Sequence, residues 1–200
     1  VLLLVVSLAV LAWILTAQLR RYALARSLVD VPNARSSHSL PTPRGGGVAI
    51  VIAFLLGLGV AFFAGLGIPA ELFYALLGAG LGVALLGFLD DHGHIAARWR
   101  LLGHFVAAAW ALYWLGGLPP LVIFGGLMQL SWIGHVLAAF YLVWLLNLYN
   151  FMDGIDGIAS VEAVCVCLGG VILYALLETS LAAELPLLIL AAAVLGFLIL

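Results

Sequence analysis

The sequence predicts an all-α polytopic membrane protein with about seven transmembrane helices, and three observations support this. Hydrophobic residues make up 66% of the 200 residues, charged residues make up 8%, and the mean hydropathy is +1.30. A soluble domain has roughly 45–50% apolar and about 25% charged residues. Long apolar runs approach the roughly 20 residues that a helix needs to cross the hydrocarbon of a bilayer. Every arginine and every aspartate falls into three breaks between these runs, at 20–44, 90–100 and 150–157.

Seven apolar segments are the expected helices. They cover residues 1–19, 46–66, 70–89, 101–118, 133–149, 158–177 and 185–200. The stretch 101–149 decides the count, because its length suits two spans and is too short for three. Between those two spans, Pro119 and Pro120 stop a helix and the β-rich residues 121–126 predict a short hairpin or interfacial segment. The details of 119–132 stay open.

All seven cationic side chains, each an arginine, fall on one face of this topology. An excess of arginine in short loops marks the cytoplasmic side, so the polar loops are expected in the cytoplasm and the hairpin in the periplasm. No soluble domain is present, and residues 1–200 are interpreted as a single integral membrane domain. Because Val1 is not an initiator methionine and the last apolar run stops at Leu200, we interpret this domain as the N-terminal part of a longer one. The bilayer is the expected surrounding, and no nucleic-acid partner is predicted.

The first break combines prolines, glycines and basic residues. Three prolines forbid a continuous helix, and Gly45 to Gly47 let the backbone approach a ligand before the next span begins. A glycine-rich helix entry next to Arg44, with His38 nearby, suits an anionic group such as a phosphate. An ordinary basic loop that contacts lipid head groups is the alternative.

The second break begins with two adjacent carboxylates, Asp90 and Asp91, at the end of an apolar run. Two such groups repel each other, and both stay ionised more easily with a cation between them. Hard oxygen ligands suit Mg²⁺, with Mn²⁺ as a substitute, which shares phosphate oxygens with a substrate. A solvated helix end whose charges are balanced by Arg98 and Arg100 is the alternative.

The third break is the most specific of the three. Asp153 and Asp156 are three residues apart and share a face if the segment is helical. With Asn147 and Asn150 they end an apolar run, which is costly unless these side chains line a wet cavity. Glu162, one turn into the next run, is interpreted as reaching back to the surface.

Together, the three breaks predict a metal-assisted site for a phosphorylated, nucleotide-like donor, with a lipid acceptor supplied by the membrane. The main rival class is a multi-span transporter or channel. It predicts charges near the middle of the bilayer, whereas these charges cluster at the ends of the apolar runs.

Three segments of the sequence, one in each break, resemble the polyprenyl-phosphate N-acetylhexosamine-1-phosphate transferases of glycosyltransferase family 4. They are Asp-Val-Pro-Asn-x-Arg-Ser-x-His with Pro-Thr-Pro-Arg-Gly-Gly-Gly at 30–47, Gly-Phe-Leu-Asp-Asp with Ala-Arg-Trp-Arg-Leu-Leu at 87–102, and Asn-Phe-Met-Asp-Gly-Ile-Asp-Gly at 150–157. The resemblance implies an enzyme of the bacterial inner membrane that moves a sugar 1-phosphate from a UDP-sugar to undecaprenyl phosphate and releases UMP. The first break looks more like the branch that initiates lipopolysaccharide O-antigen than the peptidoglycan branch, whose phospho-N-acetylmuramoyl-pentapeptide transferase is the alternative.

The resemblance also implies roles for individual residues. The catalytic candidates are Asp90, Asp91, Asp153 and Asp156. The substrate-binding candidates are Asn147, Asn150, Arg98, Arg100, His38 and Arg44. Asp91 and Asp156 are the candidate Mg²⁺ ligands, and the main ligand is expected in a Gly-Asp-x-Gly-Ser segment beyond Leu200. The sequence leaves open which aspartate acts as a base, which UDP-sugar is used, whether 200 residues suffice for activity, and the oligomeric state, a homodimer included.

Overall fold

The computed structural model describes residues 1–26, 29–30, 42–43, 45–93, 95–152, 157–177 and 181–200. The described part forms seven helices, in the order of the seven predicted apolar segments. They are α1 (Leu2–Ala25), α2 (Gly47–Phe63), α3 (Ala70–Gly93), α4 (Ala97–Leu115), α5 (Ser131–Met152), α6 (Ile158–Leu176) and α7 (Leu181–Leu198). It also forms four short strands, β1 (Val29–Asp30), β2 (Thr42–Pro43), β3 (Leu121–Ile123) and β4 (Gly126–Met128).

Four of the described helices, α1, α3, α5 and α6, are long and apolar enough to cross a membrane. Helix α2 and the Ala183–Leu198 part of α7 are shorter apolar helices. Helix α4 has 19 residues and is long enough, but it begins with Ala-Arg-Trp-Arg and its hydropathy is lower than that of these four helices. The prediction of a multi-pass, all-α membrane protein is therefore confirmed, while the crossing of each helix stays an expectation.

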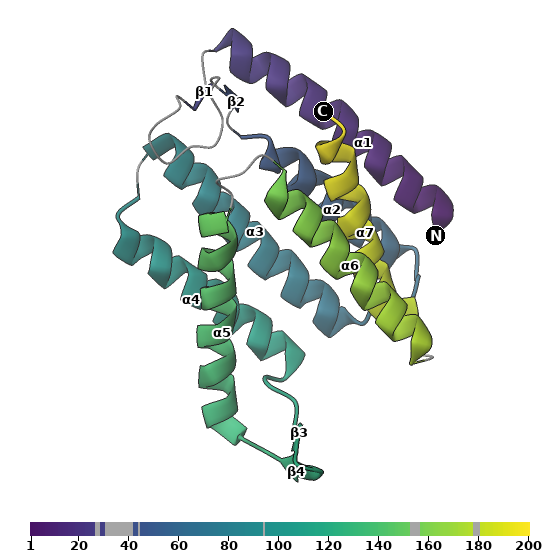
Figure 1. The fold of residues 1–200 in the computed structure, drawn as a ribbon, viewed down its shortest axis with the longest axis vertical. Helices are drawn as coiled ribbons and strands as arrows, with labels where there is room; N and C mark the ends of the chain where they lie inside the picture. Colours follow the sequence, from purple (N-terminus) through teal and green to yellow (C-terminus); the bar gives the residue numbers. More distant parts are fainter. Residues whose placement is uncertain (27–28, 31–41, 44, 94, 153–156, 178–180) are drawn as a thin grey trace. The chain divides into compact units, whose positions relative to one another are not determined.

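The chain divides into two compact units, which we describe separately. The first consists of Val1–Pro69 and Phe151–Leu200, and it contains α1, α2, α6 and α7. In it, α7 packs against α1, α2 and α6 (Figure 1). Ala12, Ala53 and Ala193 form a fully buried cluster where α1, α2 and α7 meet. Small side chains at such a contact let helix backbones approach closely, which is how helices associate in lipid.

Two glycines show how closely these helices approach. A Cβ atom added to Gly196 of α7 would collide with the carbonyl oxygen of Ala9 in α1. One added to Gly57 of α2 would collide with the side chain of Leu8. Gly59, two residues further along α2, has nothing within 4 Å of the added atom. Within the described residues, packing against backbone therefore requires glycine at position 196, a side chain at position 57 would have to displace Leu8, and position 59 has room for a side chain.

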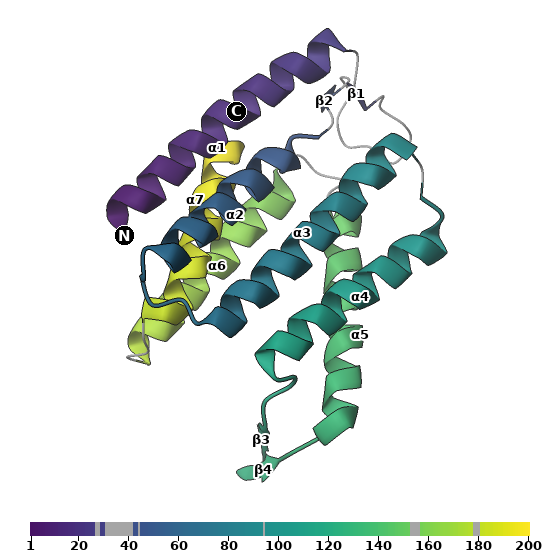
Figure 2. The same cartoon turned by 180° about the vertical axis from the view of Figure 1, so that it is seen from behind.

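The second unit, Ala70–Asn150, is built on the paired helices α3 and α4 (Figure 2). The indole N–H of Trp110 donates a hydrogen bond of 2.8 Å to the carbonyl oxygen of Tyr74, because Gly78 leaves room for the ring. Nearer the end of α3 and the start of α4, a Cβ atom added to Gly103 would lie 2.7 Å from a methyl carbon of Leu86. The two helices are thus in close contact along much of their length.

The segment between α4 and α5 contains a β-hairpin, one of the two alternatives that the sequence left open. Strands β3 and β4 pair antiparallel, with Ile123 opposite Gly126. The two loop residues, Phe124 and Gly125, have φ angles of 49° and 81°. Positive φ at both central residues is the conformation of a type I′ turn, which matches the twist of a two-stranded hairpin. Figure 2 shows the hairpin beyond the ends of α4 and α5.

At their polar ends, α1, α3, α4 and α5 extend past the apolar runs that predicted them. Asp90 and Asp91 lie in the last turn of α3, Arg98 and Arg100 lie at the start of α4, and Asn147 and Asn150 lie in α5. The second and third breaks are therefore much shorter than the sequence predicted. Hydropathy reports the thickness of the hydrocarbon, whereas backbone hydrogen bonding continues into polar residues at the membrane surface. The first break is helical up to Ala25, the end of α1, and further along β1 pairs antiparallel with β2.

Candidate active site

Asp90 is the best-defined polar residue of the predicted site. Its Oδ2 atom accepts a hydrogen bond from Nη1 of Arg100 at 2.8 Å, and its Oδ1 atom accepts one from the backbone N–H of Ile95 at 2.9 Å. Asp90 is at the end of α3, and Arg100 is in the first turn of α4. The two side chains are 24% and 36% exposed, so water only partly screens their attraction. The structure thus joins one predicted catalytic residue to one predicted phosphate-binding residue.

Asp91 and Arg98 have different surroundings from Asp90 and Arg100. Both side chains are exposed, and neither forms an ion pair within the part of the chain that the structure describes. The guanidinium carbon of Arg98 lies 5.7 Å from the centre of the Trp99 ring. Asp91 and Arg98 are therefore available to a ligand at the junction of α3 and α4.

The two asparagines lie near the end of α5. The amide nitrogen of Asn147 donates a hydrogen bond of 2.7 Å to the carbonyl oxygen of Val143, one turn earlier. This bond fixes the amide and leaves its oxygen as an acceptor. Asn150 is exposed. Both residues belong to the same unit as the α3–α4 junction.

Four predicted site residues lie outside the described residues: His38, Arg44, Asp153 and Asp156. The structure therefore assembles only part of the predicted constellation, the part formed by Asp90, Asp91, Arg98 and Arg100. Within the described ranges, no three His, Cys, Asp or Glu side chains come together as a metal-binding group. Asp91 offers a suitable hard oxygen donor, but it would need partners from elsewhere in the protein.

Two titratable side chains within the helices, those of His104 and Glu162, each have a buried polar atom. Nδ1 of His104 and Oε2 of Glu162 are buried and have no hydrogen-bond partner among the described residues. For Glu162, the expectation that the side chain reaches the surface is wrong for this oxygen. A carboxylate inside an apolar helix is itself a signal for a functional residue, and that signal is present in the sequence.

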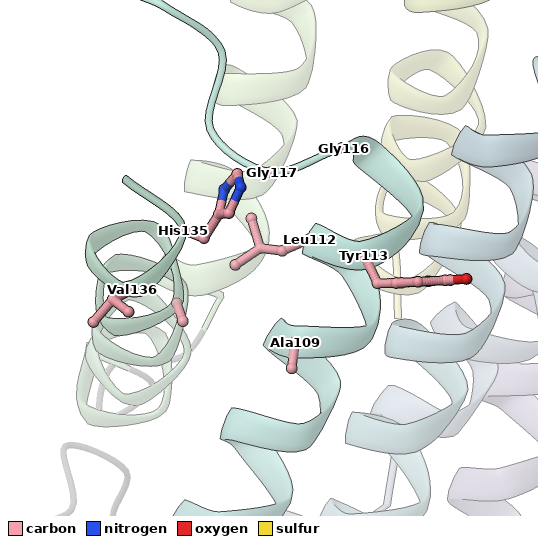
Figure 3. Close-up of a pocket in the computed structure, with 8 residues that line it drawn as sticks. Ala109, Leu112, Tyr113, Gly116, Gly117, His135 and Val136 are labelled. Atoms are coloured by element: carbon pink, nitrogen blue, oxygen red, sulfur yellow. The ribbon is translucent and has the colours of Figure 1, made fainter. Parts of the chain in front are cut away.

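A pocket of about 500 Å³ lies between α4 and α5, away from the predicted site residues (Figure 3). It is lined by residues of the second half of α4, such as Leu112 and Tyr113, and by His135 of α5. Arg100 lies 13 residues before Tyr113, which is roughly 20 Å along the helix axis. The backbone N–H of Leu118 donates a hydrogen bond of 3.2 Å to Nδ1 of His135. His135 thus has a structural role here.

The apolar helices, and a charged junction at the ends of two of them, define a multi-pass membrane protein with a polar site at its helix ends. The family model of glycosyl transferase family 4 matches residues 73–200, which is most of the chain. The chain belongs to glycosyl transferase family 4.

The curated relatives that match this chain are named as sugar-phosphate transferases. The chain is 29% identical over 198 residues to the decaprenyl-phosphate N-acetylglucosaminephosphotransferase of Mycobacterium tuberculosis, which covers 83% of this chain and 46% of the relative. It is 26% identical over 160 residues to the probable undecaprenyl-phosphate N-acetylglucosaminyl 1-phosphate transferase of Bacillus subtilis, covering 74% and 40%. It is 28% identical over 155 residues to the phospho-N-acetylmuramoyl-pentapeptide-transferase of Bacillus licheniformis, covering 71% and 48%. The chain thus spans less than half the length of each of these relatives.

Proposed function

We propose that the full-length protein transfers an N-acetylhexosamine 1-phosphate from a UDP-sugar to undecaprenyl phosphate. The observation that carries this proposal is membership of glycosyl transferase family 4, together with relatives named for transfer of N-acetylglucosamine phosphate to a polyprenyl phosphate. The charged junction of α3 and α4 supports it, because its arginines and carboxylates suit a diphosphate and a cation. The transporter alternative lacks comparable support, because these charges lie at the ends of their helices.

In the proposed reaction, an oxygen of the lipid phosphate attacks the phosphorus atom that carries the sugar. The bond from that phosphorus to the bridging oxygen of the diphosphate breaks, and UMP leaves with this oxygen. Such transfers depend on positioning and on charge stabilisation. Arg98 is the described cation best placed to hold a phosphate, since it is exposed and forms no ion pair among the described residues. Asn147 and Asn150 would hydrogen-bond the donor, as would His38 and Arg44 from the first break.

The proposed cofactor is Mg²⁺, with Mn²⁺ as a substitute. Asp91 and Asp156 would hold it, together with an aspartate beyond Leu200 that the resemblance implies. Asp91 fits this role by its chemistry, because its exposed carboxylate forms no ion pair within the described residues. When bound, the cation would neutralise negative charge on the diphosphate. The resemblance offers Asp90 and Asp91 as alternative bases, and Asp91 is the better candidate of the two because it is exposed and forms no ion pair within the described residues. Asp153 would line the nucleotide and diphosphate site with Asp156.

We further propose the bacterial inner membrane as the location, with the site facing the cytoplasm. The arginines that follow α3 and end α1 support this orientation, since positive loops stay in the cytoplasm. The product, an undecaprenyl diphosphate sugar, would initiate an O-antigen-like polysaccharide. The second candidate is the synthesis of a peptidoglycan precursor, and the relative from Bacillus licheniformis favours it.

The proposal is tested with the purified full-length protein, undecaprenyl phosphate and a panel of labelled donors. The panel contains UDP-N-acetylglucosamine, other UDP-N-acetylhexosamines and UDP-N-acetylmuramoyl-pentapeptide. We expect release of UMP with at least one N-acetylhexosamine donor, dependent on the lipid and abolished by a chelator of divalent cations. Release with the pentapeptide donor alone would support the second candidate, and no release with any donor would rule out both.

The chain offers a matched control for variants at this site. Glu71 lies in the first turn of α3, at the opposite end from Asp91, and carries the same charge. The separation of 20 residues corresponds to roughly 30 Å along the helix. Asp91→Asn is expected to abolish UMP release, whereas Glu71→Gln is expected to keep it near the wild-type rate.

A further inference from the structure

We propose that Asp90 and Arg100 are positioning residues, whose ion pair fixes the turn between α3 and α4 and presents Asp91 and Arg98 to ligands. This inference rests on the proposed function and deepens it. The sequence treats Asp90 and Asp91 as equivalent, and likewise Arg98 and Arg100. The structure separates each of these pairs into an inner residue, which binds the protein, and an outer residue, which faces outward.

The inner aspartate, Asp90, is hydrogen-bonded to other groups of the protein. Both of its carboxylate oxygens accept hydrogen bonds, one from Arg100 and one from the backbone N–H of Ile95. These bonds link the end of one helix, the short connection and the start of the next helix. A carboxylate held by a guanidinium and a backbone N–H uses charge-assisted hydrogen bonds, which are among the stronger ones in proteins. It is a poorer candidate for a base or for a metal ligand than Asp91, because the guanidinium of Arg100, 2.8 Å away, disfavours a second positive charge on the same carboxylate.

Helix electrostatics explains why the two charges pair across the turn. Asp90 and Asp91 lie at the C-terminal end of α3, where the helix dipole disfavours negative charge. Arg98 and Arg100 lie at the N-terminal end of α4, where the dipole disfavours positive charge. Contact between Asp90 and Arg100 places each charge against the helix end that favours it. The same argument leaves Asp91 and Arg98 uncompensated, which favours a bound cation at the first and a bound anion at the second.

Packing directly below the ion pair sets the register of the two helices. Leu86 is one turn before Asp90 on α3, and Gly103 is one turn after Arg100 on α4. A Cβ atom added to Gly103 would lie 2.7 Å from Leu86, so the helices touch at this level. The ion pair therefore closes a helix contact that is already tight. Movement of the pair would shift the last turn of α3, where Asp91 is located.

The outer residues differ from the inner ones by their place on the helix. Asp91 follows Asp90 by one residue, a rotation of about 100° around the axis of α3. Its side chain is exposed, as is that of Arg98. Among the described residues, neither forms an ion pair that would compete with a ligand. We therefore assign ligand contact to Asp91 and Arg98, and alignment of these residues to Asp90 and Arg100.

The central experiment is a charge swap in the full-length protein, Asp90→Arg combined with Arg100→Asp. Each single variant should lower UMP release by about 100-fold, the cost of a catalytic group displaced by roughly 1 Å. The swap should recover at least a tenth of the wild-type rate, because it keeps an ion pair between the two helix ends. Recovery would be incomplete, since the N–H of Ile95 loses its acceptor. A swap as inactive as the single variants would overturn the proposal.

A second set of measurements separates alignment from direct ligand contact. Mn²⁺ binding is followed by electron paramagnetic resonance, and melting temperature by intrinsic tryptophan fluorescence. Asp90→Ala and Arg100→Gln should lower the melting temperature, whereas Asp91→Asn and Arg98→Gln should not. Asp91→Asn should weaken Mn²⁺ binding at least tenfold, and the charge swap should keep it within about threefold of wild type. Loss of Mn²⁺ binding in Asp90→Asn with an unchanged melting temperature would instead make Asp90 a ligand.

The two proposals fail in different ways. If the wild-type protein releases no UMP with any donor, the proposed function fails. The melting temperatures and Mn²⁺ binding of the same variants would still decide whether Asp90 and Arg100 act as a positioning pair. If the wild type is active but the swap melts no higher than the single variants, only the positioning pair is ruled out.

Discussion

At the scale of single residues, identical side chains have different roles according to what surrounds them. The glycines show this as clearly as the aspartates. Gly196 lies against the backbone of α1 and has no room for a Cβ atom, whereas Gly59 has open space around it. A glycine in a helix costs roughly 1 kcal/mol relative to alanine, so it is favoured only where the packing requires it. Only the structure distinguishes these two cases.

A first prediction concerns the stability of the variant Gly196→Ala. The added methyl group would collide with the carbonyl oxygen of Ala9, and a backbone atom cannot move aside as a flexible side chain can. We expect a destabilisation of about 1–3 kcal/mol, the usual cost of overpacking, seen as a lower melting temperature of the purified protein. Gly59→Ala is the matched control, and it should be neutral or slightly stabilising. Equal melting temperatures for the two variants would contradict the close approach of α1 and α7.

At the scale of helices and strands, the sequence predicts number and order well but predicts ends poorly. Seven apolar runs correspond to seven described helices, because each run must bury its backbone hydrogen bonds in lipid. The ends differ because a helix stops where its backbone geometry changes, not where hydropathy falls. Gly116 and Gly117 end α4 with φ angles of 74° and 85°. Glycine at a left-handed helix end is a familiar stop signal, but the contact of Gly117 with His135 is not visible in sequence.

A second prediction concerns the end of α4 and the variant Gly117→Ala. Its positive φ makes any side chain costly, and a Cβ atom would also collide with the ring of His135, which accepts the N–H of Leu118. Gly125→Ala is the matched control, because its φ of 81° carries the same cost but nothing lies within 4 Å of the added atom. We expect roughly 1–2 kcal/mol of destabilisation for the control and more for Gly117→Ala.

A double variant isolates the contact. Combining Gly117→Ala with His135→Ala removes the ring that the new methyl group meets. The double variant should therefore lose less stability than the sum of the two single variants. Additive losses, measured by thermal unfolding, would show that His135 does not pack against Gly117.

At the scale of the whole molecule, the sequence could predict which charged residues lie at helix ends but not how they are partnered. The clustering of arginines and aspartates in three breaks follows from the cost of charge in hydrocarbon, and that cost is readable from sequence. The pairing of Asp90 with Arg100 depends on the register of α3 and α4, which is set by contacts such as that of Leu86 with Gly103. No local pattern encodes that register. Family membership then supplies the chemistry, which neither hydropathy nor geometry specifies.

The last prediction concerns the path of α4 through the membrane. Its 19 residues measure about 28 Å at 1.5 Å per residue, close to the roughly 30 Å of hydrocarbon that a span must cross. Its first turn carries arginines that belong on the cytoplasmic side, and the hairpin tip at Phe124 follows its other end. Arg98 and Phe124 are both exposed, so a cysteine at either position is accessible to a reagent.

In a background without other cysteines, Arg98→Cys and Phe124→Cys are treated with a membrane-impermeant maleimide in intact cells and in inverted vesicles. We expect Arg98→Cys to react only in inverted vesicles and Phe124→Cys only in intact cells. Reaction of both from the same side would show that α4 does not cross, and the sidedness of every later helix would change with it. Reaction of each from the opposite side would keep the span but reverse the protein, placing the α3–α4 junction outside the cytoplasm and away from any UDP-sugar.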